Sequence, residues 1–205
     1  MSKSIDDTAA ARHRAKMEKR KAVQDAEVAG KTVEKGLLMV HTGTGKGKST
    51  AAFGLALRML GRGHRIGVVQ FIKGAWHSAE RDALARFGDQ VVWHSMGEGF
   101  TWETQDRARD IAAAERAWGK AQELLADERF ALVILDELNI ALRYDYLDLA
   151  GVIAALTARR PGLHVVVTGR NAKPELITAA DLVTEMTLVK HHFAAGVKAQ
   201  PGIEF

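Results

Sequence analysis

A nine-residue segment from Thr42 to Thr50 has the composition of a loop that binds phosphate. It stands between a short apolar run and a stretch of good helix formers. Its glycines allow backbone N–H groups to close around phosphate oxygens, Lys48 supplies a positive charge, and the hydroxyl of Ser49 is a ligand for Mg²⁺. We therefore predict a nucleotide site whose phosphate-binding residues are Gly43, Thr44, Gly45, Lys46, Gly47, Lys48, Ser49 and Thr50.

This loop departs from the strict phosphate-loop pattern at its first position. The pattern G-x-x-x-x-G-K-[ST] requires glycine where this chain has Thr42, and Gly43 follows one residue later. An expected strand, the loop and an expected helix nevertheless occur in the required order. That order favours a variant phosphate loop over a turn that is merely rich in Gly and Lys.

Two adjacent carboxylates, Asp136 and Glu137, follow the apolar run Leu132–Leu135. At the carboxyl end of a buried strand, an acidic side chain can face a phosphate loop and bind Mg²⁺ directly or through water. Taken alone, the pair could equally be a cap or part of a salt bridge. The phosphate loop favours the metal-binding interpretation, and the spacing leaves open which carboxylate contacts the metal.

A third segment, Gly97 to Gln105, places Phe100 and Trp102 on either side of a threonine in a Gly-rich loop. No helical pattern surrounds the two aromatic side chains. They could pack the loop against the core, or they could cover a flat apolar ligand. The pattern alone leaves both interpretations open.

The elements that must position these residues alternate between short β-branched runs and longer stretches of helical period. Strands are expected over 37–41, 66–72, 90–94, 132–136, 164–168 and 182–188, and helices over 49–60, 79–87, 106–126, 146–158 and 174–179. Such alternation predicts a single-domain α/β fold of the P-loop NTPase type, with a mostly parallel central sheet and helices on both faces. Ligands bind beyond the carboxyl ends of such strands, where the three segments lie.

Composition excludes several classes of protein. The chain has 205 residues, of which 47% are hydrophobic, so global disorder and a large multidomain machine are excluded. It has no cysteine, so disulfides and thiolate nucleophiles are excluded, and a metal must be held by oxygen or imidazole. Because no apolar run approaches the ~18 residues of a membrane helix, we expect a cytoplasmic protein without membrane contact.

The excess of basic residues lies in residues 1–35, which contain nine Lys and Arg against six Asp and Glu. Residues 36–205 contain 20 against 19. The segment Ala9–Val28 is polar nearly all round and is expected to form a helix without a core of its own. It could be a solvated extension, a docking element or a nucleic-acid contact. Because the remaining chain is almost neutral, we expect no nucleic-acid partner and consider an ATP-gated nucleic-acid-binding module a weaker alternative.

From Gly36 to Phe205 the chain resembles the phosphate-loop type of ATP:corrinoid adenosyltransferases, which act on cob(I)alamin or cob(I)yrinic acid a,c-diamide. The resemblance rests on six blocks in the same order: Val40–Gly54, Val68–Gly74, Gly99–Thr104, Leu135–Leu138, Thr168–Arg170, and a final block that joins Val189–His191 with Gly196–Glu204. The Phe-Thr-Trp loop is much more specific than the phosphate loop.

The resemblance implies a reaction in which the 5′-deoxyadenosyl group of ATP moves to the cobalt of a corrinoid and the whole triphosphate leaves. In this family ATP lies reversed along the loop relative to ordinary NTPases. Because Co(I) is itself the nucleophile, no catalytic base is needed. A phosphate-loop kinase that transfers the γ-phosphate to a small molecule is the leading alternative, although an Arg-rich lid is not evident.

The resemblance also implies roles for individual residues. Phe100 and Trp102 match the catalytic aromatic pair that displaces the lower ligand of cobalt. Ser49 and Glu137 would hold Mg²⁺ or Mn²⁺, and Asp136 would support these ligands without contacting the metal. Arg58 would reach a phosphate or the ribose. Candidates for contacts with corrinoid or phosphate are Arg107, Arg170, Lys190 and His191.

The family further implies two protein partners. One is a reduced flavoprotein that donates electrons. The other is a second copy of the chain, because in the family the N-terminal helix of one subunit covers the active site of its partner in a homodimer. Residues 1–35, interpreted as an extension of the domain formed by residues 36–205, match such a helix.

Overall fold

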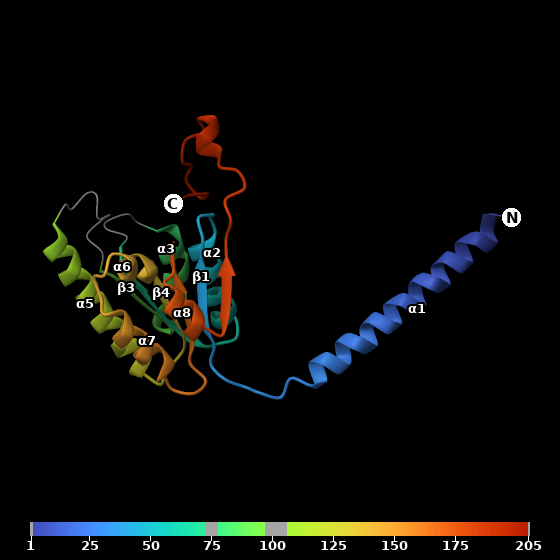
Figure 1. The fold of residues 1–205 in the computed structure, drawn as a ribbon, viewed down its shortest axis with the longest axis horizontal. Helices are drawn as coiled ribbons and strands as arrows, with labels where there is room; N and C mark the ends of the chain where they lie inside the picture. Colours follow the sequence, from blue (N-terminus) through green and yellow to red (C-terminus); the bar gives the residue numbers. More distant parts are fainter. Residues whose placement is uncertain (1, 73–77, 97–105, 205) are drawn as a thin grey trace. The chain divides into compact units, whose positions relative to one another are not determined.

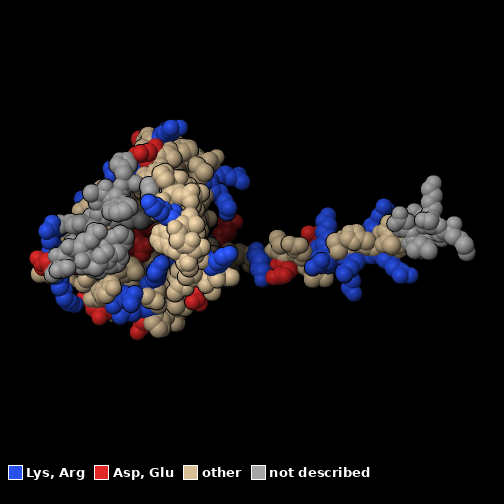
Figure 2. All heavy atoms as spheres, turned by 90° about the horizontal axis from the view of Figure 1, so that it is seen from above, with Lys and Arg blue, Asp and Glu red and all other residues tan. Residues whose placement is uncertain are grey.

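The computed structural model describes residues 2–72, 78–96 and 106–204, with side chains from residue 8 onward. The chain divides into two compact units, Met1–Glu34 and Lys35–Phe205. The first unit contains one helix, α1 (Ser2–Ala29), whose described side chains are all exposed. Lys and Arg side chains occur along its length (Figure 2). A helix that is polar all round has no apolar face of its own to bury, so α1 does not form a separate core.

The second unit is built on a six-stranded sheet (Figure 1). Its strands are β1 (Leu38–Thr42), β2 (Arg65–Gln70), β3 (Val91–Ser95), β4 (Phe130–Asp136), β5 (His164–Thr168) and β6 (Leu182–Glu185). They lie in the order β3-β2-β4-β5-β1-β6, and every neighbouring pair is parallel. All carboxyl ends therefore meet at one edge, and the predicted α/β fold with a parallel sheet is confirmed.

Helices cover both faces of this sheet (Figure 1). One face packs against α2 (Lys48–Leu60) and α3 (Ala79–Ala85), and the other against α5 (Arg107–Ala126), α6 (Leu138–Arg143), α7 (Leu149–Thr157) and α8 (Pro174–Ala179). In β4, Leu132 and Ile134 belong to the first core, whereas Val133 and Leu135 belong to the second. Burial on both faces explains why this strand is a continuous apolar run in the sequence.

Two predicted elements differ from the structure by three residues at one end, and one helix is additional. The strand expected over 182–188 ends at Glu185, because Met186 turns toward the phosphate loop and its N–H donates to the main-chain oxygen of Thr42 at 2.9 Å. The helix expected over 146–158 begins at Leu149. The carboxylate of Asp148 accepts a hydrogen bond from the N–H of Gly151 and so caps the start of the helix. The six-residue helix α6 was not predicted.

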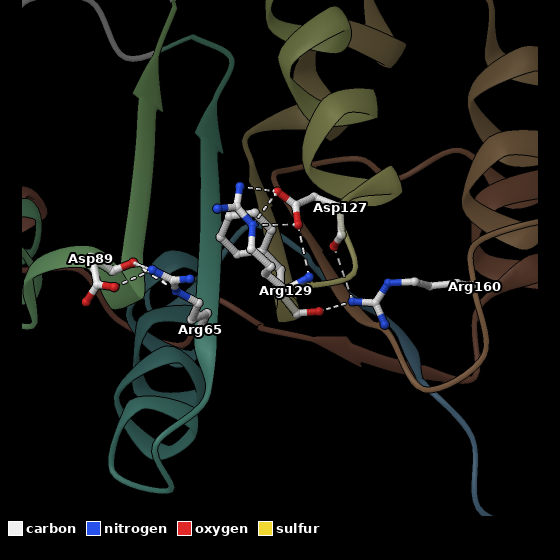
Figure 3. A network of polar contacts seen from close by, with 6 residues as sticks. Arg65, Asp89, Asp127, Arg129 and Arg160 are labelled. Atoms are coloured by element: carbon white, nitrogen blue, oxygen red, sulfur yellow. Dashed lines mark hydrogen bonds and ion pairs between the residues drawn. The ribbon is translucent and has the colours of Figure 1, made fainter.

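A network of arginines and aspartates stabilises the amino ends of the strands, opposite the predicted ligand edge (Figure 3). Arg65, at the start of β2, binds Asp89 of the short 3₁₀ helix η1 (Gly88–Gln90). Arg129 binds Asp127 and holds the pKa of that carboxyl at about 2. Arg160 donates to main-chain oxygens at the start of β4. These ion pairs and hydrogen bonds link the starts of β2 and β4 to the loops beside them. They lie away from the loop that is expected to bind phosphate.

Candidate functional site

The predicted phosphate loop connects the end of β1 to the first residue of α2. Gly43 and Gly47 have φ angles of 95° and 103°, in the left-handed region that favours glycine. A Cβ atom on Gly43 would lie 2.4 Å from the main-chain oxygen of Met186. The N–H of Gly45 donates to that same oxygen at 2.6 Å. The glycines therefore allow the loop to turn tightly and the segment after β6 to pack directly against it.

Lys48 is buried within the loop, and its Nζ donates to the main-chain oxygen of Gly45 at 2.6 Å. Burial lowers the pKa of Lys48, the charge of Glu137 raises it, and the charges of Arg170 and Lys46 lower it. These electrostatic effects require the charged groups to lie near one another. Lys46 and Lys48 thus belong to the loop itself, and the charges that act on Lys48 come from Glu137 and Arg170, which follow the carboxyl ends of β4 and β5.

The first turn of α2 holds the two predicted hydroxyl residues, Ser49 and Thr50. The residue that precedes the helix is Gly47, which has no side chain to cap it. His41, at the end of β1, is buried, and its Nδ1 lies 3.2 Å from the main-chain oxygen of Lys48. Since a carbonyl oxygen only accepts, His41 must donate from Nδ1. This bond fastens the start of α2 to the end of β1.

The two carboxylates at the carboxyl end of β4 take different directions. Asp136 is fully buried, and its oxygens accept from Gln70 Nε2 at 3.0 Å and from Thr168 Oγ1 at 2.8 Å. Glu137 has φ 62° and ψ 19°, and a Cβ atom on Gly169 would lie 3.1 Å from its Oε2. Asp136 is thus bonded into the sheet edge, whereas the Glu137 carboxylate lies where its charge acts on Lys48.

The segment after β6 supplies a residue that sequence reasoning missed. Glu204 forms an ion pair with Lys46, and its Oε1 lies 3.1 Å from Nε2 of His192. Its side chain is only 9% exposed, and Lys46 holds the pKa of the carboxyl below its ordinary value. Glu204 lay within a block that resembles the adenosyltransferases. No local pattern indicated that it would contact the phosphate loop, because the two residues are far apart in the sequence.

The candidates His191, Lys190 and Arg107 occupy two different places. His191 stacks on His192, with ring centroids 4.7 Å apart, and so lies beside the residue that contacts Glu204. Lys190 precedes this pair and is exposed. Arg107 begins α5, where its guanidinium lies 5.8 Å from the centroid of the Tyr146 ring. Their contacts with corrinoid or phosphate stay predictions.

Arg58 lies in the last turn of α2 and is exposed. At a rise of 1.5 Å per residue, it is about 15 Å along the helix from Lys48. The structure does not group it with the loop residues, and its contact with a phosphate or the ribose stays a prediction. Phe100 and Trp102 lie outside the described residues, in the part of the chain that connects β3 to α5.

Two general features of the described residues bear on ligands. No helix among them is long and apolar enough to cross a membrane. Within residues 2–72, 78–96 and 106–204, no three His, Asp or Glu side chains gather as a metal site would require. A Mg²⁺ site that uses one or two protein oxygens together with substrate phosphates needs no such group.

Comparison with known proteins identifies the family. Residues 34–205 match the family model described as ATP:corrinoid adenosyltransferase BtuR/CobO/CobP. The chain belongs to this family. Residues 1–28 match a second model, described as cob(I)alamin adenosyltransferase N terminal. ATP:corrinoid adenosyltransferases use ATP to adenosylate corrinoids, and the kinase alternative is not favoured.

Named relatives extend the match over nearly the whole chain. A corrinoid adenosyltransferase from Pseudomonas aeruginosa is 59% identical, covering 95% of this chain and 96% of the relative. One from Sinorhizobium is 58% identical, covering 95% and 92%. Corrinoid adenosyltransferase CobA from Salmonella typhimurium is 47% identical, covering 95% and 98%. The predicted family and enzyme class are therefore confirmed, whereas the roles of single residues stay predictions.

Proposed function

We propose that the phosphate loop of this adenosyltransferase holds the triphosphate of ATP as a leaving group while the ribose C5′ reacts. The observation that carries the proposal is the buried Lys48 of the loop, whose Nζ lies 2.6 Å from the main-chain oxygen of Gly45, with Lys46 in the same loop and the charges of Arg170 and Glu137 acting on Lys48. Three cations at one loop suit a polyanion that gains negative charge as it departs. Backbone N–H groups at the start of α2 add positive potential at the same place.

Ser49 and Glu137 are proposed to hold Mg²⁺ or Mn²⁺. Both supply oxygen, which is the donor these hard cations prefer, and both belong to elements that meet at the carboxyl edge of the sheet. Asp136 is bonded to Gln70 and Thr168, which favours Glu137 as the direct ligand. When bound there, the cation supplies positive charge beside the triphosphate oxygens.

The proposed transfer balances without a catalytic base. Co(I) of the corrinoid donates an electron pair to C5′ and forms the Co–C bond. The bond from C5′ to oxygen breaks, and its electron pair leaves on the triphosphate. No proton moves at the reacting atoms, so the residues of this chain act by binding, orienting and stabilising charge.

The remaining roles extend this proposal. Phe100 and Trp102 are proposed to displace the lower ligand of Co(II) and so to ease its reduction, with electrons from a reduced flavoprotein. Helix α1 is proposed to cover the active site of a second copy in a homodimer. The match of residues 1–28 to an adenosyltransferase N-terminal model supports a role for α1 in this family. We propose the cytoplasm as the place of the reaction.

Anaerobic incubation with ATP, Mg²⁺ and chemically reduced cobalamin tests the transfer. We expect triphosphate to form in step with a light-sensitive adenosylcorrinoid spectrum. Formation of ADP without a new corrinoid spectrum would instead support the kinase alternative.

A second assay starts from Co(II) cobalamin and a flavoprotein reductant, where Trp102→Ala should retain ATP binding and lose most activity. Equal activity of the two proteins would remove Trp102 from the mechanism.

A further inference from the structure

The buried amide of Gln70 joins two neighbouring strands at the carboxyl edge of the sheet. Gln70 ends β2 and is 2% exposed, and its Nε2 donates to Oδ2 of Asp136 at 3.0 Å. Its Oε1 accepts from Ser95 Oγ at 2.9 Å and from Trp93 Nε1 at 3.2 Å, both on β3. Because a carboxylate accepts and an indole N–H donates, these partners determine which way the amide is oriented.

The hydrogen bonds continue from Asp136 to Glu137 through Thr168. Thr168 is fully buried at the end of β5, and its Oγ1 donates to Oδ1 of Asp136 at 2.8 Å. The same Oγ1 accepts from the N–H of Glu137 at 3.0 Å. A hydroxyl has one proton, so its donation to the carboxylate leaves a lone pair for Glu137. A directed row of hydrogen bonds thus crosses β3, β2, β4 and β5.

Glu137 depends on this support because its backbone is held in an unfavourable conformation. Its φ of 62° and ψ of 19° place a residue with a Cβ atom in the left-handed region, which is unfavourable for such residues. This conformation directs the carboxylate over Gly169 and toward Lys48. Without an acceptor for its N–H, the backbone of Glu137 could relax, and the carboxylate would turn away from the phosphate loop.

We infer that Thr168 and Gln70 are positioning residues, which hold the Glu137 carboxylate toward the phosphate loop, Thr168 by a direct bond and Gln70 by way of Asp136. The inference rests on the proposed metal site and assigns to both residues a role that is separate from contact with substrate. Groups that orient a metal ligand typically contribute about 10- to 100-fold to metal affinity. Thr168, which bonds to Glu137 directly, should therefore matter more than Gln70, which acts through Asp136.

The test measures Mn²⁺ binding to the full-length protein with ATP and without corrinoid, from the electron paramagnetic resonance signal of free Mn²⁺. Thr168→Val keeps the shape of the side chain and removes the hydroxyl, and we expect it to weaken Mn²⁺ affinity about 10-fold. Thr168→Ser should restore affinity to within about twofold of wild type, because the hydroxyl returns. The matched control is Thr178→Val, since that exposed hydroxyl bonds only to Pro174 among the described residues.

A second variant, Gln70→Met, keeps the volume of the side chain and removes the amide. We expect it to weaken Mn²⁺ affinity by about threefold or more. If Thr168→Val does not fold, as judged by circular dichroism, Gln70→Met and Thr168→Ser carry the test. Wild-type Mn²⁺ affinity in a folded Thr168→Val or in Gln70→Met, with only the melting temperature lowered, would overturn the inference. If the wild type binds no Mn²⁺ with ATP, the proposed metal site itself is overturned.

Discussion

Lys46, in the middle of the phosphate loop, is ion-paired with Glu204, which lies 158 positions further along the chain. His192 contacts the same carboxylate, with 3.1 Å between Nε2 and Oε1. The Glu204 carboxylate thus neutralises Lys46, one of the loop cations proposed to bind triphosphate. Lys46 can contact a triphosphate fully only if it shares or releases Glu204.

We predict that Glu204→Gln binds ATP more tightly than the wild type. Removing the carboxylate frees Lys46, and it also removes the repulsion between Glu204 and the triphosphate. For a partly exposed ion pair, we expect ATP affinity to rise about threefold. Isothermal titration calorimetry with ATP at low ionic strength measures the affinity. The control is Glu175→Gln, an exposed residue in the first turn of α8 that should leave the affinity unchanged. Weaker binding by Glu204→Gln would mean instead that the carboxylate holds Lys46 in its working position.

Lys48→Met should abolish most adenosylation. The substitution keeps the length of the side chain and removes the charge that is buried beside the loop. Loss of one preorganised donor to developing negative charge typically lowers turnover by about 100-fold or more. Single-turnover formation of adenosylcobalamin measures the effect, and Lys120→Met on α5, a half-buried lysine paired with Glu123, is the control. Turnover within twofold of wild type would show that Lys48 does not stabilise the leaving group.

Gly43→Ala should lower both the melting temperature and ATP affinity. The alanine would have to adopt a φ of 95°, which is unfavourable for a residue with a Cβ atom. That Cβ atom would also lie 2.4 Å from the main-chain oxygen of Met186, so the loop and the segment after β6 must separate. The comparison is Gly54→Ala within α2, where a Cβ atom would meet nothing within 4 Å. That change should stabilise the protein by about 0.5–1 kcal/mol, because alanine is the better helix former. Equal melting temperatures in the two variants would contradict this account.

His164 should make stability depend on pH near neutrality. Its Nδ1 accepts from the N–H of Leu37 at 3.2 Å, and burial, with smaller effects from Arg159 and His64, lowers the pKa of His164 below its ordinary 6.5. The unfolded chain then binds a proton more readily than the folded one. The stabilisation is therefore full above about pH 6.5 and declines as the pH falls through the lower pKa of the folded state.

Urea unfolding at pH 8.0 and pH 5.5 measures this dependence in the wild type and in His164→Asn, whose amide oxygen can still accept from Leu37. We expect the variant to lose less stability on acidification. His94, whose pKa is also lowered by burial, contributes with the same sign in both proteins. The difference between the two proteins therefore isolates His164, and identical pH dependence would exclude it.

Much of the fold could be predicted from the sequence because its signals are local. The strand His164–Thr168 and the helix Pro174–Ala179 have the predicted bounds. A strand that is buried on both faces, such as β4, is a continuous apolar run in the sequence. A loop that turns tightly needs glycine where φ is positive, as at positions 43 and 47. The helix α6 escaped prediction because no capping side chain marks its start, whereas α8, which is equally short, begins with a proline at its first helical position.

The amino-acid sequence by itself determined the alternation of strands and helices, the phosphate loop and the acidic end of β4. Only the tertiary structure decided which distant residues meet them. Gln70 and Asp136 are 66 positions apart, Asp136 and Thr168 are 32 apart, and these residues meet because β4 lies between β2 and β5. The physical reason is that propensity and periodicity depend on neighbours along the chain, whereas contacts between strand ends depend on strand order. That order is set by the packing of the whole sheet.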